Sequence, residues 1–509
     1  MNDTEIGKLS CRLESNIEQL HKLLGESSDL VIKELQLEQD THVSLIYIDG
    51  LVDTQLFHNS ILYSLQDSSS SELLRELDPE QKIEMMKKRI LMAGDLSVIH
   101  DYSQFVHDML SGNVMLLLDG TSTALRIGLP GWEDRNVSEP SSQTVVRGPM
   151  EGFTENLRTN TALVRRKIKD SHLWLETYQI GKVTQTSVSI MYLSNLANKD
   201  LVLEVKRRLT KIDTDSILES GYIEEFIQDK AATPFPTLYN SDRPDTIAAG
   251  ILEGKVAILT DGTPFVLLAP TFFVAFFQSA EDYYQRSDIS TLLRFVRFIS
   301  FFITLLAPSL YVAITTYHQE MIPTTLVISL AAQREGVPFP AFVEALFMEL
   351  TYEILREAGV RIPKNIGQAI SIVGTLVIGQ AAVAAGFISS AMVIIVSITA
   401  ISSFVIPETG MAVAARMIRF VLIVLAGFIG LYGILCGIIV VVLHLASLRS
   451  FGMPYMSPFG PYNSNDLKDS IFRFPWPLLK TRPEENKTQD LTRQGTSNHE
   501  VAANEKKNK

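Results

Sequence analysis

The sequence predicts an α/β soluble N-terminal region, made of two tandem similar α/β subdomains, followed by an all-α multi-span transmembrane domain. Two observations carry this prediction. Charged residues occur throughout the first half of the chain but nearly vanish from about residue 298 to residue 448, and the first half contains an internal repeat. A chain of 509 residues is long enough for two or three such domains.

The composition argues against several classes of protein. The formal net charge is −12, whereas a nucleic-acid binder carries a basic excess, so we expect no nucleic-acid partner. The two cysteines, Cys11 and Cys436, cannot form a disulfide framework, and no cysteine and histidine spacing suggests a zinc site. Phosphate loops and the common hydrolase motifs are missing from the sequence. We therefore expect no catalytic residues, no cofactor and no metal site, and a protein that is not an enzyme.

Residues 1–39 form a polar, charged segment that is predicted to be helical. The segment has neither the apolar core of a signal peptide nor a cleavage site of small residues. We therefore expect the N-terminal region to stay in the cytoplasm, with membrane insertion driven by the later apolar segments.

The internal repeat predicts two similar subdomains, at residues 40–145 and 180–290. The matching segments are residues 111–121 with 253–263, and residues 44–51 with 189–196. Both pairs lie a little over 140 residues apart, so their offsets agree.

Each repeat contains an Asp-Gly pair between two apolar runs, at Asp119 and at Asp261. This pattern predicts a hairpin, because glycine accepts the positive φ that such turns need. A metal-binding or catalytic role for the aspartates is disfavoured, because no partner carboxylate or histidine recurs with them. Between the subdomains, residues 146–179 are predicted to hold a linker helix that begins at Pro149, since proline suits the first helical turn.

Uncharged stretches within residues 291–450 predict four or five membrane spans, each of about 20 residues. Residues 298–319 predict the first span, residues 365–407 are long enough for two, and residues 420–448 form the last block. Prolines and charges interrupt residues 321–343, so this segment is open to three interpretations: a broken span, a re-entrant segment or an interfacial helix.

Basic clusters before the spans favour five crossings over four, because such clusters remain on the cytoplasmic side. They are Arg294 with Arg297, Arg356 with Arg361 and Lys364, and Arg416 with Arg419. A single helix over residues 420–448 would then place the basic tail on the opposite side, a conflict that the sequence leaves open.

An acidic stripe follows the weak segment. Residues 341–357 have helical periodicity, and Glu349, Glu353 and Glu357 recur every four residues. One interpretation is an amphipathic helix at the membrane surface, and the other is a lining of a water-filled cation path in an oligomer. Gln380, at mid-span, is a further candidate for that path, although such residues more often join neighbouring helices.

Several motifs in the same order along the chain resemble the GerA family, the A subunits of bacterial spore germinant receptors. They occupy residues 147–156, 243–245, 252–254, 261–264, 356–364, 378–383, 448–452 and 454–461. The resemblance covers about residues 40–483. The motif positions with expected structural roles are Arg147, Gly148, Glu151, Gly152, Phe153, Asn156, Asp261, Gly262, Arg361 and Pro363. The turn at residues 406–409 departs from the family pattern.

The resemblance implies an integral protein of the spore inner membrane or bacterial cell membrane, in contact with membrane lipid. It implies two partners, a multi-span, nutrient-binding B subunit and a lipoprotein C subunit. It also implies a homo-oligomer, with a pentamer as the expected form, that acts as a nutrient-gated cation channel and initiates spore germination. A membrane transporter component and a membrane-anchored signalling protein remain as alternatives. The polar tail, residues 451–509, is expected to be disordered after about residue 483.

Overall fold

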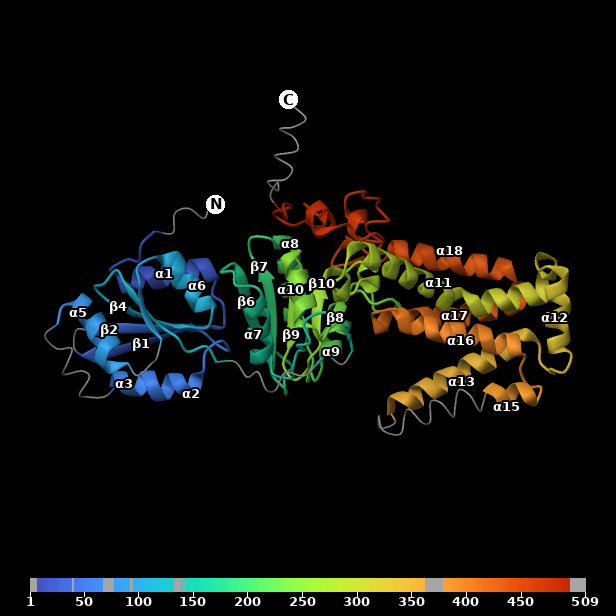
Figure 1. The fold of residues 1–509 in the computed structure, drawn as a ribbon, viewed down its shortest axis with the longest axis horizontal. Coiled ribbons are helices and arrows are strands. Elements are labelled where there is room, and N and C mark those ends of the chain that lie inside the picture. Colours follow the sequence, from blue (N-terminus) through green and yellow to red (C-terminus); the bar gives the residue numbers. More distant parts are fainter. Residues whose placement is uncertain are drawn as a thin grey trace, which may run out of the picture. The chain divides into compact units, whose positions relative to one another are not determined.

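The computed structural model describes residues 7–38, 41–66, 77–91, 95–131, 139–140, 142–361 and 379–494. The chain forms two compact units (Figure 1). The first contains residues 1–228, 238–270 and 480–509, and the second contains residues 229–237 and 271–479. The first unit is α/β and the second is helical, which confirms the predicted fold class.

The first subdomain is an antiparallel sheet in the order β1-β2-β4-β5-β3. Its strands are β1 (Leu30–Glu38), β2 (Thr41–Ile48), β3 (Leu96–Ile99), β4 (Val114–Leu118) and β5 (Ala124–Ile127). One face packs against α1 (Leu13–Leu24) and α6 (Tyr102–Leu110), and the other against η1 (Phe57–Leu62) and α5 (Pro79–Met85). Because both faces are covered, β2 is apolar at neighbouring positions: Leu45 faces one core and Ile46 the other.

The second subdomain repeats this architecture in the order β6-β7-β9-β10-β8. Its strands are β6 (Leu173–Ile180), β7 (Thr186–Leu193), β8 (Tyr239–Ser241), β9 (Val256–Thr260) and β10 (Val266–Ala269). Its helices are α7 (Leu157–Lys167), α8 (Lys199–Thr210), α9 (Ser220–Ile227) and α10 (Pro244–Leu252). The identical strand order confirms the tandem duplication that the sequence repeat predicts.

Each repeat starts earlier than the sequence analysis placed it. The Asp119 carboxylate accepts a hydrogen bond from the backbone N–H of Leu13 at the start of α1, and Asp261 accepts one from Leu157 at the start of α7, both at 3.1 Å. The N-terminal segment therefore supplies the first helix of the first subdomain, and the linker helix is its equivalent in the second. The Asp-Gly turns form as predicted, with φ of 86° at Gly120 and 88° at Gly262.

The linker helix is shorter than predicted. It begins at Leu157, where the Asn156 side chain caps it by accepting a hydrogen bond from Thr159 N, and not at Pro149. The preceding residues are held in extended form by other contacts: Phe153 N donates to the carbonyl of Asp242 at 2.8 Å. A tertiary contact therefore competes with the helical preference of this segment.

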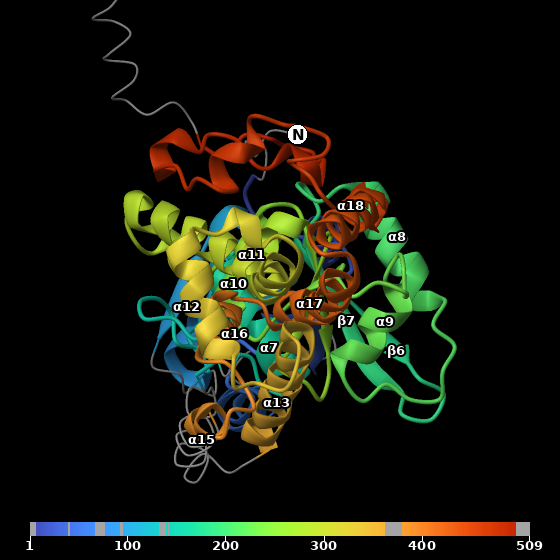
Figure 2. The same ribbon diagram turned by 90° about the vertical axis from the view of Figure 1, so that its right-hand side faces the viewer.

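The second unit is a bundle of helices. They are α11 (Ser287–Tyr317), α12 (Thr324–Arg334), α13 (Ala341–Arg361), α15 (Gly379–Ala384), α16 (Ser390–Val405), α17 (Thr409–Ile429) and α18 (Leu431–Ser447). Helices α16, α17 and α18 contact α11, as Figure 2 shows in a view along the bundle. Within the described residues, α11 and α17 are long and apolar enough to cross a membrane, while α16 and α18 are shorter apolar helices. Pro363 and most of the predicted span after it lie outside the described residues.

The last apolar block is two helices and not one. Gly430 has φ 69° and ψ −143°, a conformation suited to glycine, and it ends α17 and starts α18. A Cβ on Gly437 would lie 2.4 Å from Leu422, and one on Gly433 would lie 2.4 Å from the Leu425 carbonyl oxygen, so α18 turns back along α17. The tail therefore returns to the end of the bundle at which α17 begins.

The tail is ordered further than predicted. The Ser450 hydroxyl donates to the carbonyl of Thr237 at 2.7 Å within the second unit. In the first unit, Gln489 N donates to the carbonyl of Leu196 at 2.9 Å and Asn486 Nδ2 to that of Glu253 at 2.9 Å. These hydrogen bonds hold residues 484–494, which the sequence analysis expected to be disordered, and residues 495–509 lie outside the described residues.

Candidate functional site

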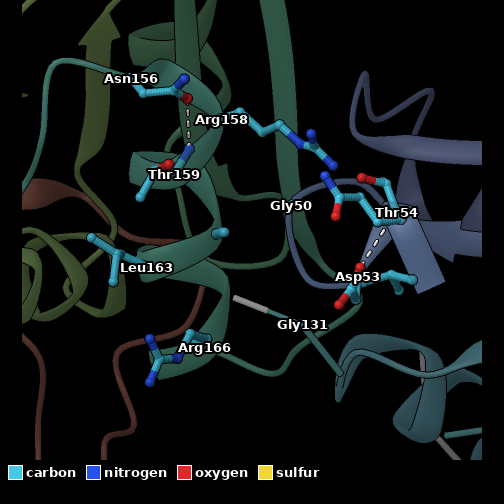
Figure 3. Close-up of a pocket in the computed structure, with 12 residues that line it drawn as sticks. Gly50, Asp53, Thr54, Gly131, Asn156, Arg158, Thr159, Leu163 and Arg166 are labelled. Carbon is cyan, nitrogen blue, oxygen red and sulfur yellow. Dashed lines mark hydrogen bonds between the residues drawn. The ribbon is translucent and has the colours of Figure 1, made fainter. Parts of the chain in front are cut away.

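A polar cleft of about 360 Å³ lies between the two α/β subdomains (Figure 3). The loop after β2, with Gly50 and Asp53, forms one wall, and the outer face of α7, with Arg158 and Arg166, forms the other. Gly50 permits this close approach, because it has φ 85° and a Cβ there would lie 3.1 Å from both the Arg158 carbonyl oxygen and the Ala162 Cβ.

The polar side chains of the cleft already have structural partners. Asp53 accepts hydrogen bonds from the backbone of Gln55 and Leu56, at 2.9 and 3.0 Å, and caps the helix that follows. Arg158 forms an ion pair with Asp49 at 2.6 Å, with both side chains about half exposed. None of the described residues that line the cleft is a serine, cysteine or histidine. The cleft is thus lined by polar side chains that are held by these contacts.

A buried ion pair joins the two α/β subdomains. Arg165 of α7 donates from Nε to Asp29 Oδ2 at 2.7 Å and from Nη2 to Asp29 Oδ1 at 2.9 Å. Arg165 is 1% exposed and Asp29 is 6% exposed. The sequence analysis missed Asp29, which lies just before β1 in a segment read only as polar.

Two of the family motifs meet in the second subdomain. Arg243 is buried, pairs with Asp245 at 2.7 Å and donates to the carbonyl of Pro149 at 2.9 Å. This contact joins the motif at residues 243–245 to the motif at residues 147–156. Arg243 was quoted as a motif residue, but its contact with Pro149 follows only from the fold.

The other motif positions are spread over both units. Phe153 and Gly152 are buried, Glu151 pairs with Lys167 at 3.2 Å, and Arg147 is exposed. Gly148 is half-buried, and Asp261 and Gly262 form the turn that contacts the start of α7. Arg361 forms an exposed pair with Glu357 one helical turn away, at 2.6 Å.

A cluster of buried charges joins α13 to α17 in the helical unit. Glu349 pairs with Arg419 at 2.5 Å, and the side chains of both residues are 0% exposed. Glu353 pairs with Arg416 at 2.7 Å and lies 3.7 Å from Arg419. The structure therefore brings two of the predicted acidic residues together, facing two arginines of α17.

Glu357 and Gln380, the other two predicted residues, are exposed and lie outside this cluster. Arg416 and Arg419 were predicted to flank the last span, but they lie within α17. The sequence signal for their pairing was present, since opposite charges inside apolar segments require partners.

Another buried carboxylate lies near the start of α13. Glu344 pairs with Arg334 of α12 at 3.2 Å and accepts hydrogen bonds from the backbone and hydroxyl of Ser389, at 3.0 and 2.8 Å. Sequence reasoning missed this residue. In the part of the chain that the structure describes, no three histidine, cysteine, aspartate or glutamate side chains are grouped to hold a metal ion.

The sequence is similar to those of known spore germination proteins. The sequence model of the Bacillus/Clostridium GerA spore germination protein family matches residues 18–485. Spore germination protein KA of Bacillus subtilis is 49% identical over 96% of this chain and 89% of its own length. Spore germination protein GerLA of Bacillus cereus is 39% identical over 96% of this chain and 99% of its own length.

A solved structure is also similar to part of this chain. It is the crystal structure of the N-terminal domain of the A subunit of the Bacillus megaterium spore germinant receptor GerK3. That domain is 36% identical, covers 53% of this chain and 98% of its own length, and superposes with a TM-score of 0.43.

Proposed function

Because the chain belongs to the GerA family of spore germination proteins and has the role of a germinant-receptor A subunit, we propose that it forms a nutrient-gated cation channel as a homo-oligomer, with a pentamer as the expected form. In this proposal it spans the inner membrane of the spore with its N-terminal region in the cytoplasm. Its partners are the nutrient-binding B subunit and the lipoprotein C subunit.

The observation that carries this proposal is the charged cluster between α13 and α17. Charged side chains inside a membrane are costly, face the interior of a helix bundle and mark paths for ions or protons. Glu349 and Glu353 fit that description, because they lie on one face of α13 among apolar helices. Rings of such carboxylates, one set from each copy in an oligomer, select cations.

The pairing with arginine suggests how such a path would close. Arg416 and Arg419 neutralise the two carboxylates in the described arrangement. In our proposal this arrangement is the closed state, and opening moves α13 relative to α17 so that the carboxylates face the path. The three guanidinium nitrogens of Arg419 make no hydrogen bond among the described residues, so the ion pair is not fully satisfied and its separation costs less.

Neutralising the carboxylates tests the proposal. We expect spores with Glu349→Gln and Glu353→Gln to release potassium more slowly than wild-type spores after addition of a nutrient broth, in a strain whose other germinant receptors are deleted. Glu357→Gln is the matched control, because it makes the same change on the same helix at a side chain that is 66% exposed. Potassium release is measured in the medium, and subunit level in the spore membrane by immunoblot.

A second variant separates conduction from folding. Glu349→Gln with Arg419→Gln removes the carboxylate without leaving an unpaired buried charge, so we expect a normal subunit level together with slow potassium release. Potassium release at the wild-type rate from both variants, at wild-type subunit levels, would remove the cluster from the ion path.

A further inference from the structure

The tail segment of the second unit, residues 469–479, carries a row of exposed apolar side chains. The exposed fraction is 55% for Phe472, 37% for Phe474, 44% for Trp476 and 52% for Leu478, whereas Arg473 is 3% exposed. We name Phe472, Phe474, Trp476 and Leu478 the apolar strip. Trp476–Leu478 form a 3-10 helix, so the strip is not a single extended strand. Arg473 lies on the buried face of the segment, and the four side chains of the strip lie on its exposed face.

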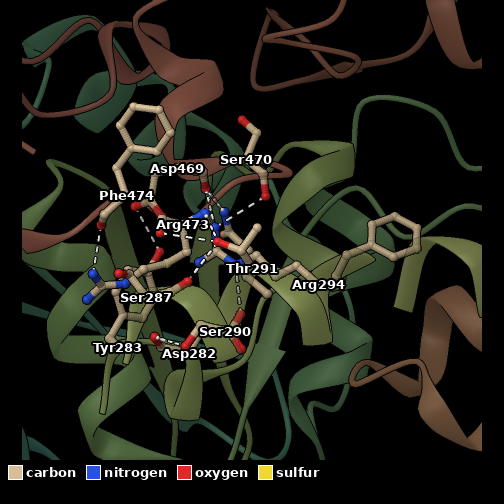
Figure 4. Close-up of polar contacts among 12 residues, drawn as sticks. Asp282, Tyr283, Ser287, Ser290, Thr291, Arg294, Asp469, Ser470, Arg473 and Phe474 are labelled. Carbon is tan, nitrogen blue, oxygen red and sulfur yellow. Dashed lines mark hydrogen bonds and ion pairs between the residues drawn. The ribbon is translucent and has the colours of Figure 1, made fainter. Parts of the chain in front are cut away.

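The buried face is fixed to the start of α11 (Figure 4). Arg294 donates to the carboxylate and the carbonyl of Asp469, at 3.0 and 2.7 Å. Arg473 N donates to the Thr291 hydroxyl at 3.1 Å. Arg294 also pairs with Asp282 at 2.9 Å, and both of these side chains are 0% exposed. The strip therefore has a defined position beside the first turns of α11.

Aromatic stacking orients the strip. The Arg473 guanidinium lies over the rings of Tyr283 and Trp476, 5.4 and 5.1 Å from their centroids. The two rings are themselves 5.7 Å apart. Stacking on buried Arg473 holds Trp476 in place, and 44% of the tryptophan remains exposed.

Exposed apolar side chains also occur on the first turns of α11. Ile289, Leu292 and Phe295 are 46, 62 and 54% exposed, and they lie within four residues of Thr291, which binds Arg473 beside the strip. Exposed apolar side chains of this kind mark a contact with a partner or a membrane. Phenylalanine and tryptophan beside a basic residue are typical of the boundary between lipid and water, and exposed Lys468 is such a residue.

We propose that the apolar strip lies in the headgroup layer of the phospholipid bilayer, beside the point where α11 enters the membrane. The tail segment then acts as an interfacial anchor that holds the first turns of α11 at a fixed depth. This inference rests on the proposed membrane placement of α11, since the segment that carries the strip is bound to the first turns of that helix.

Single-tryptophan variants of the full-length chain in nanodiscs test this inference. The chain has three tryptophans, Trp132, Trp174 and Trp476. The strip reporter keeps Trp476 alone, through Trp132→Phe and Trp174→Phe. The control keeps Trp174 alone, which lies in the second α/β subdomain and donates to the carbonyl of Leu23 at 3.2 Å. The membrane reporter replaces all three by phenylalanine and adds Phe302→Trp, at an α11 position that is 55% exposed.

Fluorescence is compared in lipids brominated near the headgroup and in lipids brominated near the acyl-chain end. We expect the headgroup-proximal bromine to quench Trp476 more strongly than the deep bromine does, and neither to quench Trp174. Phe472→Ser with Phe474→Ser should reduce the quenching of Trp476, because the strip then loses two of its four apolar side chains.

The outcomes separate the anchor from the proposed membrane placement. Quenching of the tryptophan at position 302 without quenching of Trp476 would overturn the anchor while leaving α11 in the membrane. A blue-shifted, unquenched Trp476 would mean that protein covers the strip, which also overturns the anchor. A tryptophan at position 302 that no lipid quenches would overturn the membrane placement of α11, and the anchor with it.

Discussion

The buried pair between Arg165 and Asp29 should be the main polar contact that holds the two α/β subdomains together. Two hydrogen bonds of 2.7 and 2.9 Å join the guanidinium and the carboxylate, and Ser27 Oγ accepts a third at 3.0 Å. Arg165→Met keeps most of the side-chain volume but leaves the Asp29 carboxylate buried without its cation.

The size of the effect follows from burial. Breaking a buried ion pair from one side costs about 3–5 kcal/mol, because one charge stays desolvated and unpaired. For a unit of roughly 290 residues, each kcal/mol lowers Tm by about 2–4 °C. We therefore expect Arg165→Met to lower Tm of the first unit by about 6–20 °C. Asp29→Leu combined with Arg165→Met leaves no unpaired charge and should recover most of this loss.

Thermal unfolding of the full-length protein in detergent micelles provides the assay. With Trp132→Phe and Trp476→Phe in every variant, Trp174 fluorescence reports the transition locally, because Trp174 Nε1 donates to the carbonyl of Leu23 across the same interface. Arg158→Met is the matched control: it removes the pair with Asp49 between the same subdomains, but these side chains are 45 and 39% exposed. An exposed pair contributes about 0–1 kcal/mol. Equal shifts of Tm for Arg165→Met and Arg158→Met would refute the reasoning from burial.

Two further predictions concern a helix break and a surface carboxylate. Gly430→Ala should destabilise the α17–α18 hairpin by about 1–3 kcal/mol, because φ is 69° and a Cβ would lie 2.9 Å from the His318 ring. The control is Gly336→Ala, where a Cβ meets nothing within 4 Å. The measurement is the Tm of each variant in detergent micelles. Hydrogen bonds from Arg207 and Arg208 lower the pKa of Glu204 from 4.5 to about 2, so ionised Glu204 favours the folded state above pH 4.5 and this contribution is lost as the pH falls toward 2. Glu204→Gln should therefore flatten the decline of Tm between pH 4.5 and 2, while Glu225→Gln, at an exposed position of α9, should leave the decline unchanged.

The tandem repeat could be found from the sequence because its turns carry a local signal. Asp-Gly requires a tight turn wherever it joins two apolar runs, so both hairpins were predicted at the correct residues. The first helix of each repeat was predicted as a helix but was not assigned to the repeat, although a signal existed. Asn16 exchanges hydrogen bonds with the backbone of Ser10, and Asn160 does so with Thr154. The two asparagines are separated along the chain by nearly the same distance as the two aspartates.

The charged cluster between α13 and α17 could be predicted only in part from the sequence. The acidic stripe on α13 was visible as a periodicity of four residues, which is a local property. Its partners, Arg416 and Arg419, depend on α13 lying against α17, which is a property of tertiary packing. Because Arg416 and Arg419 are charged, the sequence analysis placed the start of the last apolar helix after them, at residue 420. Burial in ion pairs allows α17 to begin at Thr409, where Glu408 caps it by accepting a hydrogen bond from Met411 N at 2.8 Å.

Ion pairing also affects which basic residues indicate the orientation of the helical unit. Arg294 and Arg297 were counted as free basic residues, but both pair with buried Asp282, and Arg294 pairs also with Asp469. Paired arginines add little net charge to this end of the bundle, so the positive-inside rule applies better to exposed basic residues such as Lys468. The hairpin at Gly430 returns the tail to this end. The tail and the start of α11 therefore lie at one end of the helical unit, and the proposed membrane placement puts both on the same side because the last apolar block is two helices.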